Sequence, residues 1–431
     1  MPFLRVISGL SKSGFYYKPR NLLNWTACFG SRKLTQIRHA SSAVSPGHRI
    51  SAITTNNDSV SVSWTDGSTA DFHHIWLRDH CRCPQCYNST THQKEFNIVD
   101  IPLDIKPFDV SLNGPNSLSI KWPDSHETDF DAEWLKQNCY GKQGAFAVTR
   151  QAEQKQKHFL WDKNSIETNL PCPLQYGKIT SDDDELNTLF FRIVKYGFAF
   201  VEDTPTTVDA VENVSKLLGG FVKETHYGKM WEFSNEVMEH ADTAYTSDYL
   251  RGHVDSTYFS HPAGLQLLHC VGHEGTGGLN LLVDGFFAAE KLRQEDKASF
   301  EILSSTIARF HYKDEDLHLK AHGPIIEIDP FDGSLSQIRF NNYDMDIMDW
   351  LKYDEVTQFY KALRAYSAIT CAPENQFWFK LVPGLLLIMG NWRVLHGRSS
   401  FTGRRSMQGC YINGDDFFGK YRAKVLALKK T

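Results

Sequence analysis

The residues best suited to metal chemistry lie between Arg251 and Phe259, where His253 and Asp255 stand two positions apart. On an extended strand, residues two apart point to the same face, so this imidazole and carboxylate can hold one side of a metal ion. The pair is weak evidence alone, because a chain with 18 His and 51 Asp and Glu residues produces the spacing by chance. A third ligand would complete a 2-His-1-carboxylate set, which leaves coordination positions open and suits a non-haem Fe(II) oxygenase.

The candidate third ligand is His396, far downstream of this pair. The apolar run 385–389 is flanked by glycines, and this pattern predicts a buried strand. We expect His396 just past the end of that strand, where Gly397 would let the backbone turn tightly.

Arg405 is the candidate anion clamp, nine residues after His396. Its planar guanidinium can donate two parallel hydrogen bonds to a carboxylate. Arg404 is the alternative, and the spacing to Tyr411 favours Arg405. His-x-Asp, then a distant His, then Arg is the order found in Fe(II)/2-oxoglutarate oxygenases.

A wider set of segments resembles the γ-butyrobetaine dioxygenase family of Fe(II)/2-oxoglutarate oxygenases, and within it the branch that hydroxylates trimethyllysine. The resemblance runs from about Ser61 to the C-terminus, and it is specific because many independent segments occur in the same order. These segments are 227–231, 242–246, 266–270, 273–278, 282–287 and 391–397.

The resemblance implies hydroxylation of N6,N6,N6-trimethyl-L-lysine to its 3-hydroxy product, the first step of carnitine biosynthesis. It also implies Fe(II) held by His253, Asp255 and His396, with 2-oxoglutarate and O2 as co-substrates and L-ascorbate to keep the iron ferrous. The rival interpretations are a γ-butyrobetaine hydroxylase, a non-catalytic reader of trimethyllysine and a protein-lysine demethylase. The triad and Arg405 argue against a reader, and a pocket for a free amino acid would exclude peptide bonds.

For 2-oxoglutarate, the resemblance assigns Arg405 to the distal carboxylate and Leu268 to the pocket wall. Asn280 stands where related oxygenases often have Thr or Ser. Its amide can still donate a hydrogen bond, so the departure puts that one contact in doubt and leaves the co-substrate unchanged.

For the substrate, the resemblance implies an aromatic cage, because a quaternary ammonium donates no hydrogen bond and is held by ring faces at about 0.5–2 kcal/mol each. Core packing is the alternative role for any one ring. Asp242 would pair with the α-ammonium and repel a carboxylate, unless it is only a turn residue. Asn341 and Asn342 would contact the head group. The cage residues are Tyr227, Trp231, Tyr245 and Tyr411.

Two segments of the N-terminal part, 60–77 and 118–135, repeat one another. Each copy predicts an alternating strand, a turn, a second short strand and a Trp-Leu anchor. Two copies are too few for a solenoid, so we expect a small β-rich domain over residues 46–145.

Three cysteines lie close together between the two copies. The resemblance implies that these cysteines and a histidine of the second copy bind zinc. Four such ligands fill a tetrahedral site and leave no coordination position open, so the zinc would be structural. The alternatives are buried cysteines that act as small apolar residues, and His80 or His92 as the fourth ligand. The expected ligands are Cys81, Cys83, Cys86 and His126.

Composition is that of an ordinary globular chain, with 431 residues and a net charge of −5. Nucleic-acid affinity comes largely from neutralising phosphates, so this charge predicts no nucleic-acid partner. No apolar run approaches the roughly 20 residues of a membrane span, so we expect no membrane partner. The family implies a homodimer.

The first 57 residues contain no Asp or Glu, eight Lys and Arg residues, and many Ser. This composition is typical of a mitochondrial transit peptide, and a basic disordered tail is the alternative. We therefore expect residues 1–45 to lie outside the fold and the mature enzyme to act in the mitochondrial matrix. In that compartment the nine cysteines predict reduced thiols or metal ligands.

Residues 146–178 are expected to form a linker and 179–431 a catalytic domain. Helices are predicted near 286–293, 297–304 and 355–368, and strands dominate after residue 227. The pattern predicts a mixed α/β, mainly β fold, a double-stranded β-helix or jelly roll with flanking helices. A helix that begins at residues 181–184 and ends at Gly197 should bury Leu186, Leu189, Phe190, Ile193 and Val194, and a second helix should span 207–218.

Overall fold

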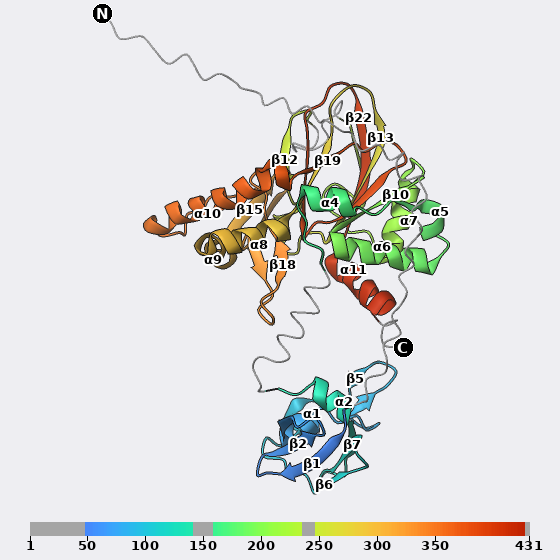
Figure 1. The fold of residues 1–431 in the computed structure, drawn as a ribbon, viewed down its shortest axis with the longest axis vertical. Coiled ribbons are helices and arrows are strands. Elements are labelled where there is room, and N and C mark those ends of the chain that lie inside the picture. Colours follow the sequence, from blue (N-terminus) through green and yellow to red (C-terminus); the bar gives the residue numbers. More distant parts are fainter. Residues whose placement is uncertain (1–47, 141–157, 235–245, 427–431) are drawn as a thin grey trace, which may run out of the picture. The chain divides into compact units, whose positions relative to one another are not determined.

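The computed structural model describes residues 48–140, 158–234 and 246–426, and these form two compact units. The first unit contains residues 48–140, and the second contains the rest of the described chain (Figure 1). The second unit already includes residue 158, earlier than the domain start expected at residue 179.

Each copy of the N-terminal repeat forms two strands and most of a six-residue helix, and a strand that precedes the copy completes a three-stranded antiparallel sheet. The helix carries the Trp-Leu pair, and its leucine, Leu77 or Leu135, is fully buried. Trp64 Nε1 donates to the Ala132 carbonyl at 3.3 Å and so links the two copies. The first sheet and helix are β1 (Ile50–Thr55), β2 (Ser59–Trp64), β3 (Thr69–His73) and α1 (His74–Asp79), and the second are β6 (Asp109–Leu112), β7 (Ser117–Lys121), β8 (Glu127–Asp131) and α2 (Ala132–Gln137), with hairpin β4 (Tyr87–Asn88) and β5 (Gln93–Lys94) between them.

The second unit contains a jelly roll made of two facing sheets. Their strand orders are β11-β22-β13-β20-β10-β9 and β12-β21-β14-β19. Side chains from both sheets, among them Leu268 and Met389 of one and Leu282 and Phe377 of the other, meet in one buried cluster. The strands are β9 (Leu174–Gln175), β10 (Phe198–Glu202), β11 (Met230–Ser234), β12 (Leu250–His253), β13 (Leu265–His273), β14 (Asn280–Asp284), β19 (Phe377–Phe379), β20 (Leu386–Gly390), β21 (Val394–Arg398) and β22 (Arg405–Ile412).

Helices cover each sheet from outside. One group packs on the six-stranded sheet through a cluster that includes Leu189, Val214 and Ile388, and another packs beside the four-stranded sheet through Val283 and Leu292 (Figure 1). The first group is α6 (Asp183–Tyr196), α7 (Val208–Gly219) and α11 (Gly414–Tyr421), and the second is α8 (Gly285–Glu295), α9 (Lys297–Ser305) and α10 (Tyr353–Cys371). Two hairpins, β15 (Ala308–Lys313) with β16 (His318–Gly323) and β17 (Ile326–Ile328) with β18 (Leu335–Ile338), complete the unit.

Helix α6 shows how local sequence sets these elements. The Asp182 side chain accepts a hydrogen bond from the Asp184 amide at its start, which satisfies one of the free amides of the first turn. Gly197 ends the helix in the left-handed conformation, with φ of 84°. The predicted buried stripe is confirmed for Leu186, Leu189, Phe190, Ile193 and Val194.

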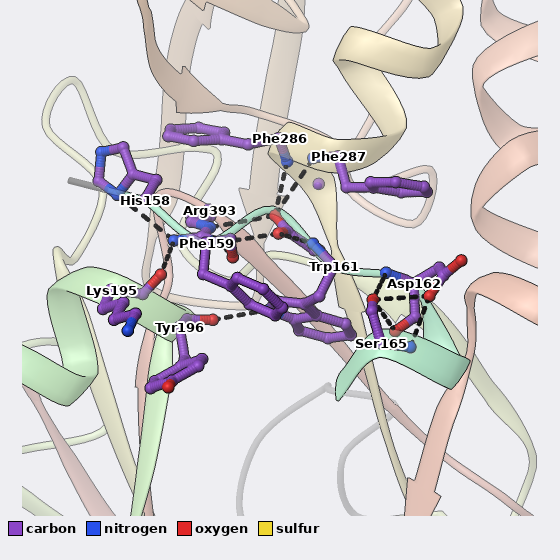
Figure 2. A network of polar contacts seen from close by, with 12 residues as sticks. His158, Phe159, Trp161, Asp162, Ser165, Lys195, Tyr196, Phe286, Phe287 and Arg393 are labelled. Carbon is purple, nitrogen blue, oxygen red and sulfur yellow. Dashed lines mark hydrogen bonds and ion pairs between the residues drawn. The ribbon is translucent and has the colours of Figure 1, made fainter. Parts of the chain in front are cut away.

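Residues 158–178, expected to belong to a linker, pack onto the catalytic unit and form α4 (Lys163–Asn169), β9 and α5 (Tyr176–Ile179). Trp161 is fully buried. Arg393 pairs with Asp284 at 2.7 Å and donates to the Phe159 carbonyl at 2.6 Å (Figure 2). This buried ion pair joins the segment to β14 and to the turn before β21, and loss of one partner from such a pair costs about 3–5 kcal/mol.

Among the helices of the described residues, none combines the length and the apolar character that a membrane crossing requires.

Candidate active site

The structure brings His253, Asp255 and His396 together. Asp255 Oδ1 lies 3.5 Å from His253 Nε2 and 3.6 Å from His396 Nε2. Ligand atoms of all three residues lie within 4.8 Å of one another, so one ion can touch them all. Two imidazoles and one carboxylate on one side of an ion fit ferrous iron and leave coordination positions for other molecules.

Antiparallel pairing of β12 with β21 places His253 directly opposite His396. The expectation that His396 follows a strand end is wrong, because it lies inside β21. The predicted strand end belongs to β20, and residues 391–393 turn the chain from one sheet into the other. Gly397 serves close packing and not a turn, since a Cβ there would lie 2.6 Å from the Leu250 carbonyl oxygen.

Neighbouring side chains orient the Asp255 carboxylate. Gln266 Nε2 and Tyr411 OH donate to its Oδ2 at 2.7 and 2.8 Å, which leaves Oδ1 facing the imidazoles. The Asp255 amide donates to Asn391 Oδ1 at 2.8 Å. His253 Nδ1 lies 2.8 Å from the Arg251 carbonyl, so Nε2 is the atom left for a metal. Such outer contacts fix ligand orientation and tautomer.

Burial and the charges of its neighbours shift the pKa of each triad residue, and for His396 and Asp255 the shift favours the form that binds a metal. Burial lowers the pKa of His396 to about 4, which keeps this imidazole neutral at physiological pH. Burial opposes ionisation of Asp255, but His396 and His253 outweigh it and hold the Asp255 pKa well below its usual range. At His253 burial also opposes the charged form, but the Asp255 carboxylate outweighs burial and raises the pKa, so a proton competes with a metal ion for this imidazole.

The triad lines a pocket that also contains a buried cation. Arg405 is 5% exposed, and its Nη2 donates to Asn280 Oδ1 at 3.1 Å. Burial lowers the Arg405 pKa to about 10, so the guanidinium stays charged near neutral pH. Asn280 Nδ2 is buried without a hydrogen-bond partner among the described residues, which leaves it available to a ligand carboxylate. Arg404 is exposed, so the clamp is Arg405.

Aromatic residues line the same pocket. Tyr227, Trp231 and Tyr411 face it, and the rings of Trp231 and Tyr411 lie 5.9 Å apart. Gly409 makes room for the indole, because a Cβ at this position would lie 2.2 Å from the Trp231 ring. The fourth expected cage residue, Tyr245, lies outside the described residues.

The other expected substrate residues differ in placement. Leu268 lines the pocket with the aromatic residues. Asn341 is buried beside the triad, in a second pocket that includes His253 and Asp255. Asn342 is exposed and lines neither of these two pockets. Asp242 lies outside the described residues.

The pocket residues missed from the sequence include Gln266, Arg398 and Tyr258. Gln266 stands two positions before Leu268 on β13, so strand alternation alone could have placed it in the pocket. Arg398 follows the triad histidine by two positions, and its Nη2 donates to the carbonyls of Thr246 and Asp248 at 2.6 and 3.2 Å. Tyr258 carries no such signal, because a turn after Asp255 brings it to the wall.

The N-terminal unit holds a second cluster of possible metal ligands. Cys83 Sγ and Cys86 Sγ lie 3.3 and 3.2 Å from His126 Nδ1. With Cys81, all four ligand atoms lie within 4.8 Å of one another. Three thiols and one imidazole at this spacing fit a closed tetrahedral zinc site.

Comparison with known proteins matches both units of this chain to family models. The model of the taurine catabolism dioxygenase TauD, TfdA family matches residues 163–411, which contain the triad and Arg405. The model of the gamma-butyrobetaine hydroxylase-like N-terminal domain matches residues 52–139.

Whole-chain relatives narrow the family. Trimethyllysine dioxygenase, mitochondrial, from Mus musculus is 38% identical over 84% of this chain and 84% of its own. Trimethyllysine dioxygenase from Meyerozyma guilliermondii is 35% identical over 86% of this chain and 95% of its own. This chain belongs to the trimethyllysine dioxygenase family. A more distant member of the group, gamma-butyrobetaine dioxygenase from Pseudomonas sp. (strain AK-1), is 30% identical over 86% of this chain and 94% of its own.

Proposed function

We propose that this trimethyllysine dioxygenase family member hydroxylates N6,N6,N6-trimethyl-L-lysine at C3, using Fe(II), 2-oxoglutarate and O2. The observation that carries the proposal is one pocket with three parts: an open metal triad, a buried Arg405 beside Asn280, and the aromatic faces of Trp231 and Tyr411. Each part matches one component of the reaction.

The chain's residues hold the components in place. Arg405 and Asn280 would bind the distal carboxylate of 2-oxoglutarate, while His253, Asp255 and His396 would hold iron. When bound, iron supplies the coupling of O2 reduction to the oxidative decarboxylation of 2-oxoglutarate. Trp231 and Tyr411 would hold the trimethylammonium group, which orients the chain carbons of the substrate toward the triad.

A second candidate is γ-butyrobetaine hydroxylation, favoured by the Pseudomonas relative of that name. A paired turnover assay separates the two, with purified protein, Fe(II) and 2-oxoglutarate, and product detection by mass. We expect hydroxytrimethyllysine to dominate. Preferential turnover of γ-butyrobetaine would move the assignment to the second candidate, and turnover of neither would contradict both.

We also propose a structural zinc in the cysteine cluster, a homodimer and dependence on L-ascorbate. The N-terminal segment would direct import into the mitochondrial matrix. The proposed reaction is the first step of carnitine biosynthesis. The close approach of Cys83, Cys86 and His126 supports the zinc. The printed names of several relatives support a mitochondrial location. Elemental analysis, sedimentation and cell fractionation test zinc, dimer and location in turn.

A further inference from the structure

A second pocket adjoins the triad and differs in character from the aromatic one. The two pockets share His253, Asp255 and Tyr258, so they meet at the metal ligands. The second also contains an acidic and two basic side chains that the first lacks, namely Asp344, His311 and Lys313. A pocket with charges of both signs suits a ligand group that is itself zwitterionic.

Asp344 is held rigidly on the wall of this pocket. Thr257 Oγ1 and Asn341 Nδ2 both donate to its Oδ2 at 2.7 Å, and the His311 amide donates to its main-chain carbonyl at 2.8 Å. Thr257 and Asn341 are buried. The carboxylate therefore needs little reorganisation to meet a cation, which reduces the cost of binding.

The positive side of the pocket is Lys313 and not His311. His311 Nδ1 lies 3.1 Å from Asp346 Oδ1, and Lys320 also approaches Asp346 at 3.6 Å, so this imidazole is engaged away from a ligand. Within the described residues, Lys313 Nζ makes no hydrogen bond or ion pair, and its side chain is exposed at the pocket. An ammonium in this state can turn toward a ligand carboxylate.

Substrate geometry links this pocket to the reaction. The α-carbon of trimethyllysine is bonded directly to C3, so a C3 that faces the triad places the amino-acid head group beside the metal ligands. The trimethylammonium group lies at the other end of the side chain and can reach Trp231 and Tyr411. Resting on the proposed function, we propose that the second pocket binds the amino-acid head group, with Asp344 on the α-ammonium and Lys313 on the α-carboxylate.

The test pairs two variants with three ligands in the full-length protein. The ligands are trimethyllysine, 6-(trimethylammonio)hexanoate, which lacks the α-ammonium, and (5-aminopentyl)trimethylammonium, which lacks the carboxylate. Affinity is measured by calorimetry and turnover by kcat/KM. Asp344→Asn keeps an oxygen that accepts from Thr257 and Asn341, so it removes the charge and retains the packing. Asp316→Asn and Lys320→Met are matched controls, because neither residue lines the pocket.

We expect Asp344→Asn to lower the affinity for trimethyllysine about 10- to 100-fold more than the affinity for 6-(trimethylammonio)hexanoate, because the variant loses a charge-assisted hydrogen bond from a fixed partner. The ratio cancels any effect of the substitution on the iron. Lys313→Met should lower the affinity for the two carboxylate-bearing ligands about 2- to 5-fold relative to that for (5-aminopentyl)trimethylammonium. The effect is smaller because Lys313 is exposed. Both controls should leave the ratios unchanged.

An Asp344→Asn variant that weakens the ligands with and without the α-ammonium equally would show a structural role and overturn the assignment. The assignment would also be overturned if the ratio of the two affinities changed in an Asp242→Asn variant and stayed at the wild-type value in Asp344→Asn. Wild-type protein that binds trimethyllysine but hydroxylates none would contradict the proposed function, while the affinity ratios would still decide the head-group assignment.

Discussion

The two ligand clusters of this chain differ in completeness, and the difference separates a structural site from a chemical one. The N-terminal cluster supplies four soft ligands, Cys81, Cys83, Cys86 and His126, which fill a tetrahedron. The jelly-roll cluster supplies three ligands, from the end of β12, the interior of β21 and, contrary to the expected shared strand, the loop after β12 that carries Asp255. The remaining positions face a pocket that contains Arg405. A closed set can only hold its ion, whereas an open one can present the ion to other molecules.

The outer contacts of the two clusters follow the same division. In the N-terminal unit, Arg78 donates to Cys86 Sγ at 3.3 Å and pairs with Asp124, so the support is tied to the fold of that unit. In the jelly roll, Gln266 and Tyr411 orient Asp255, and both also line the pocket. Support in the catalytic site is therefore shared with the ligand-binding surface.

The largest expected effect comes from removing a ligand of the open cluster. His396→Ala should reduce hydroxylation to the assay background and lower the iron content, because two remaining ligands cannot fix the ion. Zinc content should stay at the wild-type level. The measurement is turnover together with metal analysis, and the control is His269→Gln, on β13 but outside the pocket. Near-normal turnover in His396→Ala would contradict the assignment of His396 to the metal triad.

Arg405→Met should have the second-largest effect on turnover. Loss of a buried guanidinium that binds a carboxylate costs about 2–5 kcal/mol, so the KM for 2-oxoglutarate should rise at least about 30-fold. The KM for trimethyllysine should change little. Arg404→Met is the matched control, since its side chain is exposed, and a larger effect in that variant would reverse the clamp assignment.

Tyr411→Phe tests the shared support around Asp255. It removes the hydroxyl that donates to Oδ2 at 2.8 Å and retains the ring that faces the pocket. Activity or iron affinity should fall about 10- to 100-fold, as for other outer contacts of metal ligands. Binding of the trimethylammonium group should persist. A large loss of substrate affinity with intact iron affinity would show that the hydroxyl belongs to the substrate site.

Cys86→Ser should have the smallest effect on chemistry. It opens the closed cluster, so zinc should be lost and the melting transition of the N-terminal unit should fall by at least about 4 °C. Turnover per folded molecule should stay within about 3-fold of wild type. Scanning calorimetry and elemental analysis measure the two quantities, with Cys139→Ser as a control outside the cluster. Loss of iron in Cys86→Ser would show that the two metal sites depend on each other and would contradict the division between them.

Local signals made much of the fold predictable. The cap, stripe and terminal glycine of α6 lie within sixteen residues, so the capping residues, the apolar periodicity and the glycine were enough to predict the helix. The expected position of His396 was wrong because a strand's membership of a sheet depends on distant pairing, here of β21 with β12 and β14. The helices at 163–179 were missed because the Asp284–Arg393 pair and burial of Trp161 fix that segment through residues far away in sequence.

The site shows the same limit. The triad and Arg405 follow from residue type and spacing, together with the family resemblance, whereas Asn391, which binds the Asp255 amide, comes from a turn with no metal-ligand pattern. Asp344 likewise becomes visible only once the turn after Phe340 lies beside the triad. Long-range packing, and not local propensity, selects these residues.

The most direct test of the account is selective metal exchange. Purified protein is treated with a mild chelator that removes iron and leaves thiolate-bound zinc, and turnover of trimethyllysine is followed as Fe(II) or Zn²⁺ is restored. We expect activity to vanish with the iron and to return with Fe(II) alone, while the N-terminal unit stays folded throughout. Activity that survives loss of iron, or that returns with zinc, would contradict the division between an open catalytic site and a closed structural one.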